Sequence, residues 1–117
     1  MTFDPGLAER LREAFAAADV QDISERAMFG GLVFMVGGHM ACGIVADDLM
    51  VRVGPDQYAE ALARPHARAM DFTGRPLRGF VFVAPPGFEA DTDLMHWLET
   101  SLCFVASLPP RAGKADS

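Results

Sequence analysis

The sequence predicts an α+β domain in which three helices pack on one face of an antiparallel sheet. Apolar residues recur at helical spacing near both ends of the chain, and short apolar runs separated by glycine or aspartate pairs fill the middle. A chain of 117 residues that is 50% hydrophobic is long enough for one domain with a buried core. We therefore expect a single two-layer domain over residues 1–111 in the order α-β3-α-β2-α, followed by a flexible tail over residues 112–117.

The first helix is predicted from about residue 5 to residue 18. Asp4 suits the N-cap, and Pro5 suits the first helical position. Leu7, Leu11 and Phe15 then follow at helical spacing, while charged residues occupy the other face. This pattern indicates an amphipathic helix with one buried face.

Three strands are predicted next, over residues 32–36, 39–46 and 49–53. Gly37 and Gly38 separate the first two runs and are typical of a two-residue hairpin turn. A second turn is expected at Asp47 and Asp48, and the third run alternates as a strand does. Together these segments predict an antiparallel meander.

A short helix, two strands and a final helix complete the domain. The helix is expected over about residues 55–62 and ends before Pro65, because the residue before a proline disfavours helical backbone. Strands follow at about residues 69–72 and 79–83, joined by a turn at residues 73–76. Asp91 suits the N-cap of a last helix that runs to about Ser107.

The charge balance bears on the class of partner. Ten Lys and Arg residues against sixteen Asp and Glu residues give a net charge of −6. Specific nucleic-acid binding draws on cationic contacts to phosphates, so no direct specific binding of nucleic acid is expected. The longest apolar stretch, residues 28–36, is far shorter than a membrane span, and the N-terminus lacks the pattern of a signal peptide. We therefore expect no membrane contact and a cytoplasmic location.

No catalytic signature is present in the sequence. Cys42 and Cys103 stand in apolar surroundings and are expected to be reduced, buried thiols, with a redox pair or a reactive thiol as the alternative. His39, His66 and His96 show no metal-binding spacing, and no nucleophile-elbow, zinc-protease or phosphate-loop motif occurs. We expect no cofactor, no metal and no catalytic residue, and so a protein that is not an enzyme.

Three of the predicted strands, over residues 32–36, 39–46 and 79–83, are apolar on both faces, whereas a strand covered on one side should alternate apolar and polar residues. One set of side chains faces the helices, and the other set needs a second cover. A homodimer or a ligand groove would provide it, and loops and termini folded over that face are the alternative. We expect a homodimer, with these candidate interface residues: Val33, Met35, Val45, Val81 and Val83.

The middle of the chain is rich in arginine. Residues 52–78 carry five arginines against three acids, a balance of +2 in an acidic protein. A guanidinium offers a planar fork of donors to a carboxylate or phosphate, so this region supplies a candidate anion site at Arg64, His66, Arg75 and Arg78. The alternative is that solvent and the acids close to them in sequence neutralise these cations.

Several motifs together resemble one family. The segment Arg26-Ala27-Met28-Phe29-Gly30-Gly31 resembles the R-x-M-F-G-G opening of the TfoX N-terminal domain, also called TfoX/Sxy. Residues 36–40 resemble the hairpin of that family and residues 49–53 its third strand. Residues 63–66, 74–79 and 107–110, together with Trp97, resemble a stand-alone, single-domain subgroup. The resemblance extends over about residues 7–111.

The resemblance implies a two-layer α-β3-α-β2-α fold similar to that of secretion chaperones. Larger members carry a second, C-terminal domain, which we expect this chain to lack, and regulate competence genes together with a cyclic-AMP-dependent activator. The family thus implies a non-enzymatic domain that acts through protein–protein contact, with a transcription-regulatory protein as its partner. The alternatives are a chaperone-like module for an extended peptide and a small-anion binder that uses the central arginines.

Overall fold

The computed structural model describes residues 3–28, 30–71 and 76–109. The predicted tail over residues 112–117 lies outside these ranges. The elements within them are α1 (Pro5–Ala17), β1 (Ile23–Met28), β2 (Gly31–Val36), β3 (His39–Val45), β4 (Asp48–Arg52), α2 (Tyr58–Leu62), β5 (Ala67–Asp71), β6 (Pro76–Val83), the 3-10 helix η1 (Pro85–Gly87) and α3 (Asp91–Ala106).

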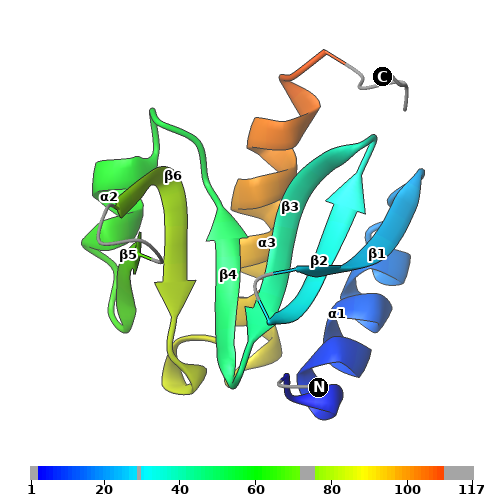
Figure 1. Ribbon diagram of the computed structural model, residues 1–117, viewed down its shortest axis with the longest axis horizontal. Helices are drawn as coiled ribbons and strands as arrows, with labels where there is room; N and C mark the ends of the chain where they lie inside the picture. The colour runs from blue at the N-terminus through cyan, green and yellow to red at the C-terminus, as the bar shows by residue number, and fades with distance from the viewer. Residues whose placement is uncertain (1–2, 29, 72–75, 110–117) are drawn as a thin grey trace.

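One six-stranded antiparallel sheet forms the body of the fold, with the strand order β1-β2-β3-β4-β6-β5. Helices α1 and α3 lie behind this sheet in Figure 1. Helix α2 joins the same layer, because its Ala61 is buried in the same hydrophobic cluster as the inward faces of α1 and α3. The predicted α+β class is confirmed.

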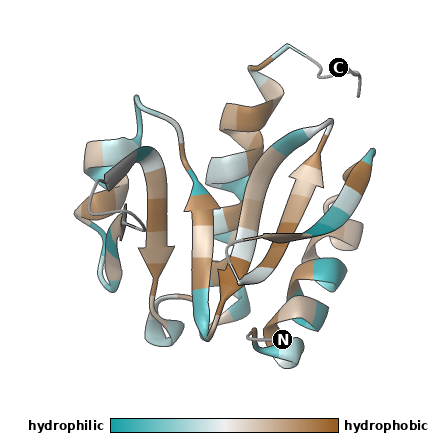
Figure 2. Ribbon diagram, in the orientation of Figure 1, coloured by the Kyte–Doolittle hydropathy of each residue, from teal (hydrophilic) through white to brown (hydrophobic). Residues whose placement is uncertain are grey.

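Strand β1 is the main difference from the predicted order. The sequence predicts three strands between the first two helices, whereas the structure has four, since β1 pairs with β2 from Ile23 opposite Val36 to Met28 opposite Gly31. Every residue of β1 is exposed except the half-buried Met28. Figure 2 shows hydrophilic residues along much of this strand and hydrophobic ones along the central strands. An edge strand of this kind lacks the apolar run by which the other strands are recognised.

Helix α1 begins as the sequence predicts. The Asp4 carboxylate accepts a hydrogen bond from the backbone N–H of Gly6 at 2.9 Å, and Pro5 occupies the first turn. The buried stripe of α1 includes Leu11 and Phe15, and the Phe15 ring lies 5.4 Å from the ring of Phe34 on β2. This stripe attaches α1 to the sheet.

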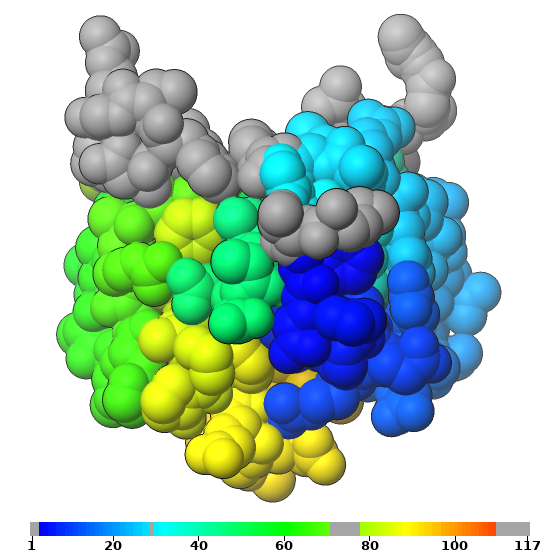
Figure 3. Space-filling model, turned by 60° about the horizontal axis from the view of Figure 1, so that its bottom comes forward, coloured from blue at the N-terminus to red at the C-terminus, as the bar shows by residue number. Residues whose placement is uncertain are grey.

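The N-terminal helix also contacts the segment that leads into α3. The guanidinium of Arg10 donates to the carbonyl oxygen of Phe88 at 2.9 Å and pairs with the Asp91 carboxylate at 3.0 Å. In Figure 3 the blue N-terminal helix accordingly lies beside the yellow segment that follows β6. The two outer helices are thus linked by polar contacts as well as by the core.

The main core lies between the sheet and the helices. Trp97 and Leu98 of α3 are 1% exposed and pack in one cluster with Val51, Val81 and Val83 of the sheet. Burial of this apolar surface is the principal stabilising contribution.

Two details show how closely α3 approaches the sheet. The buried Ser101 hydroxyl donates to the carbonyl oxygen of Ala41 on β3 at 2.6 Å. Gly54 has a φ of +86°, and a Cβ at this position would collide with the Phe104 ring. Glycine therefore meets both the backbone and the packing requirement there. None of the helices in the described ranges is long and apolar enough to cross a membrane.

Candidate functional site

The face of the sheet that points away from the helices carries a second hydrophobic cluster. We call this face the second face. Its inner row is buried and consists of Val33, Met35, Met50, Met70 and Phe82. Its outer row is half-buried, packs against the inner row, and consists of Met28, Met40, Val45 and Phe80. Five of the seven methionines of the chain thus gather on one surface.

Two arginines are anchored on the second face. The Arg68 guanidinium carbon lies 5.0 Å from the centre of the Phe82 ring, and its Nη2 is 2.6 Å from the Asp48 carboxylate. The Arg52 guanidinium carbon lies between two rings, 5.4 Å from the ring centre of Phe80 and 5.3 Å from that of Phe104 on α3. Arg52 also donates to the Met40 carbonyl oxygen at 3.3 Å. The second face therefore combines adaptable thioethers, aromatic rings and held cations.

The predicted interface residues divide between the two faces. Val33 and Met35 lie in the inner row and Val45 in the outer row of the second face. The prediction was wrong in its placement of Val81 and Val83, which are 0% exposed on the helix-covered side. Both alternating sets of β6 are apolar, so their spacing alone does not reveal which set faces the helices. Phe80 and Phe82 take the expected place of these valines.

The burial of the inner row changes the argument for a second cover. Val33 and Met50 are 0% exposed within a single chain. They need no partner to exclude water. On the second face, only the outer row is left to contact another molecule. Among the described residues, the one exposed large hydrophobic side chain is Ile23, which lies on β1 and outside both rows.

The candidate anion site is only partly assembled by the fold. Arg64 lies just after α2, with its guanidinium carbon 3.5 Å from the centre of the Trp97 ring, and its Nη2 approaches the His96 Nδ1 at 3.5 Å. Arg64 and His66 line one hollow of about 260 Å³, together with Asp93. Partial burial lowers the pKa of Arg64, against the opposing influence of the Asp93 and Glu60 carboxylates. A neighbouring carboxylate competes with any anion for this guanidinium.

Arg78 does not join Arg64 and His66. Strands β5 and β6 pair with Ala67 opposite Val83 and Asp71 opposite Pro76, so His66 precedes one end of this hairpin while Arg78 lies near the other. The separation along β6 is roughly 16 Å at about 3.3 Å per residue. Arg75 lies outside the described residues. The three described members therefore do not converge on one ligand.

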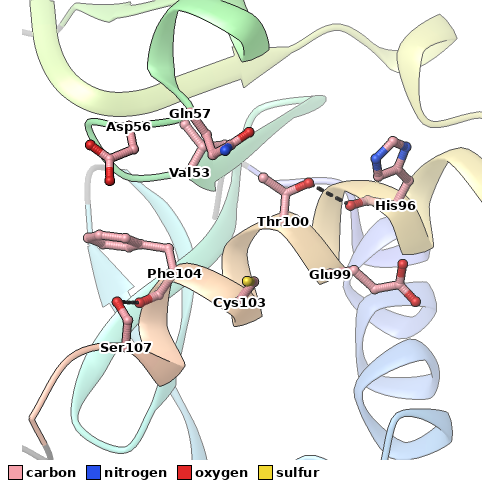
Figure 4. A pocket seen from close by; sticks show the side chains of 9 residues that line it. All are labelled: Val53, Asp56, Gln57, His96, Glu99, Thr100, Cys103, Phe104 and Ser107. Atoms are coloured by element: carbon pink, nitrogen blue, oxygen red, sulfur yellow. Dashed lines mark hydrogen bonds between the residues drawn. The ribbon is translucent and has the colours of Figure 1, made fainter.

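A groove of about 530 Å³ runs between α3 and the segment that enters α2 (Figure 4). Asp56 and Gln57 lie on one wall, and His96, Thr100 and Cys103 on the other. The Thr100 hydroxyl donates to the His96 carbonyl oxygen of its own helix at 3.0 Å, so it is not held by a base. Within the described residues, no group of three potential metal ligands comes together. The groove thus contains polar side chains without a catalytic arrangement.

The two cysteines differ in environment. Cys42 on β3 is fully buried, and burial raises the pKa of its thiol. Cys103 is exposed on α3, which corrects the prediction that both thiols are buried. The neighbours of Cys103 in sequence are apolar, but it lies on the outer side of the helix, between the buried positions Ser101 and Val105.

A comparison with known protein families identifies one family over most of the chain. Residues 13–105 match the model of the TfoX N-terminal domain, which covers most of the 117 residues. The chain belongs to the TfoX N-terminal domain family. No curated protein matches it.

The motifs of this TfoX N-terminal domain can now be placed in the fold. The segment that begins at Arg26 forms the end of β1 and the start of β2, and it contributes Met28 to the second face. The β2–β3 hairpin contributes Met40, and β4 contributes Met50. Three of the motifs that carry the resemblance therefore meet on the second face.

Proposed function

We propose that this TfoX N-terminal domain is a non-enzymatic protein-interaction domain whose second face binds a transcription-regulatory protein. The observation that supports this proposal is the outer row of Met28, Met40, Val45 and Phe80. All three α-helices contribute to the cluster on the opposite side of the sheet. The outer row is the layer on which a partner would pack.

The chemistry of the second face suits a protein partner. Methionine side chains are flexible and polarisable, so they adapt to partner surfaces of different shape. Aromatic and arginine side chains carry much of the binding energy at protein interfaces, and Arg52 and Arg68 are already held against Phe80 and Phe82. Prior ordering of these side chains reduces the entropy lost on binding.

The other functional classes have weaker support. The TfoX N-terminal domain is not a known enzymatic family. The hypothesis of an anion site is weakened, because Arg78 lies far from Arg64 and His66 along the β5–β6 hairpin and Asp93 lines the same hollow as Arg64. Direct DNA binding is opposed by the net charge of −6.

The proposal is tested by two matched methionine substitutions. Met40→Glu places a charge in the outer row, while Met95→Glu makes the same change at a half-buried position of α3. Both variants and the parent chain are used to capture proteins from the native cell extract, with circular dichroism as the check on folding. We expect a transcription-regulatory protein to be captured by the parent chain and by Met95→Glu, and to be reduced at least tenfold with Met40→Glu.

A loss of that protein with both variants would point to a general defect rather than to the second face. Equal capture by all three proteins would contradict the proposal. So would a captured set that contains no regulator of transcription.

A further inference from the structure

Strand β1 forms one edge of the sheet, and its outward backbone groups have no partner in the described chain. Gly37 donates to the carbonyl oxygen of Asp22 at 3.0 Å, which makes Asp22 and Gly37 a hydrogen-bonded pair. In an antiparallel ladder, hydrogen-bonded pairs alternate with pairs that share no hydrogen bond. The next residues whose backbone bonds to β2 are therefore Ser24, Arg26 and Met28. The backbone N–H and C=O groups of Ile23, Glu25 and Ala27 therefore point away from the sheet. None of the backbone hydrogen bonds outside the ladder involves these three residues.

The two edges of the sheet differ. Strand β5, at the other edge, has a register shift between Ala69 and Asp71, and a bulge of this kind interrupts further pairing. Strand β1 pairs in continuous register over six residues and contains no proline. In Figure 1 it is the outermost strand of the sheet. Of the two edges, β1 is the one suited to take up another strand.

The side chains of β1 define what would pair with it. Glu25 is already held by two hydrogen bonds from Arg12, at 2.7 and 2.8 Å, so its charge is compensated within the domain. Arg26, on the opposite face of the strand, is exposed and has no partner among the described residues. Ile23 is 38% exposed. The edge thus offers one uncompensated cation and one exposed apolar side chain.

A second copy of the chain does not fit this edge. On β1, only the odd-numbered residues have backbone N–H and C=O groups that point outward. In an antiparallel pair of two β1 strands, each odd-numbered residue must therefore face another odd-numbered residue. The two-fold axis of such a pair passes through a residue and not between two residues. The register centred on Arg26 places two uncompensated cations opposite one another, and the register centred on Glu25 places each Arg26 opposite Ser24, without a carboxylate. Like charges directly opposite one another are destabilising.

We propose that the edge of β1 binds an extended segment of another protein as an added antiparallel strand, with an acidic residue opposite Arg26 and an apolar residue opposite Ile23. In antiparallel pairing, the apolar residue follows the acidic one by three positions. Backbone hydrogen bonds would supply affinity, and the two side-chain contacts would supply specificity. This site is the open backbone edge of β1, which borders the second face through Met28 of the same strand, and it goes beyond the proposed function.

The probe is a fluorescein-labelled peptide of sequence TVETTV, acetylated and amidated at its ends, and its matched control is TVKTTV. In the intended register the glutamate lies opposite Arg26 and the last valine opposite Ile23. We expect the full chain to bind TVETTV at least about fivefold more tightly than TVKTTV in fluorescence anisotropy, as expected for a charge pair across strands. Arg26→Glu should reverse that preference. Arg26 is exposed, so this substitution is not expected to disturb folding. If Arg26→Glu still prefers TVETTV over TVKTTV, the inference is contradicted.

A proline pair tests the backbone contribution. Ala27→Pro removes an outward N–H and leaves the ladder with β2 intact, since proline is tolerated where the N–H of an edge strand faces solvent. We expect it to weaken binding of TVETTV about tenfold or more. Ala69→Pro, the matched change on the β5 edge, should leave binding unchanged. Equal effects of the two prolines would contradict the inference.

Amide hydrogen exchange followed by NMR locates the peptide directly. On addition of TVETTV to the full chain, the amides of Ile23, Glu25 and Ala27 should gain protection. Without peptide, the protection of these amides should not depend on the protein concentration. Protection that rises with protein concentration would show that a second copy binds at the edge, and it would overturn the inference. Changes confined to the second face would also overturn it, while leaving the proposed function intact.

Discussion

At the residue scale, Ser101 shows how one polar side chain joins a helix to the sheet. Its hydroxyl is fully buried and donates to the carbonyl oxygen of Ala41 at 2.6 Å. Ser101→Ala should lower the free energy of unfolding by about 1–3 kcal/mol, because it leaves a buried carbonyl group without its donor. Urea denaturation measures the change. Ser107→Ala removes an exposed hydroxyl that bonds within its own helix turn, and it should cost less than about 0.5 kcal/mol. Equal losses in the two variants would contradict this account of Ser101.

The residue scale also shows where sequence reasoning stops. The capping role of Asp4 and the buried stripe of α1 could be predicted, because both depend on local spacing. The exposure of Cys103 could not, since it depends on which side of α3 meets the sheet. The stacking of Arg64 on Trp97 joins side chains 33 positions apart and has no local signal.

At the element scale, β1 is held to α1 by a charged contact. The guanidinium of Arg12 bonds both carboxylate oxygens of Glu25 and holds the pKa of Glu25 below its usual value. A carboxyl group whose pKa is lower in the folded than in the unfolded chain stabilises the fold at pH values above its unfolded pKa. This contribution is lost as the pH falls through the folded pKa. Glu25→Gln should therefore be less stable than the parent chain at pH 7. The difference should shrink as the pH falls below about 4.

Urea denaturation at pH 7 and at pH 3 measures this prediction. Asp19→Asn serves as the control for the removal of one negative charge, because Asp19 has no ion pair with a described residue. A difference between Glu25→Gln and the parent chain that stays constant between the two pH values would contradict the role given to this contact.

Two errors at the element scale have physical causes. Strand β1 is exposed on almost every residue, so its sequence lacks the apolar alternation that marks half-buried strands. For β6, both faces are apolar, and a one-residue shift in phase exchanges the side chains that face the helices for those that do not. Strands β2, β3 and β4 were predictable, since paired glycines and aspartates mark the turns between them.

At the scale of the whole molecule, the sheet is a two-sided element with two different clusters. One is covered by helices, and the other carries the outer row of methionine, valine and phenylalanine. The homodimer expected from the sequence stays a prediction, and the outer row would be its interface in place of Val81 and Val83. A partner protein and a second copy would therefore compete for the same surface.

The central claim is that the second face binds a transcription-regulatory protein, and site-specific photo-crosslinking tests it most directly. A benzoylphenylalanine is placed at position 40 in the outer row, or at position 95 on α3 as the control, and the protein is irradiated in its native cells. The account predicts a crosslink from position 40, and not from position 95, to a protein that regulates transcription. Crosslinks from position 40 only to a second copy of the chain, or equal crosslinks from both positions, would contradict it.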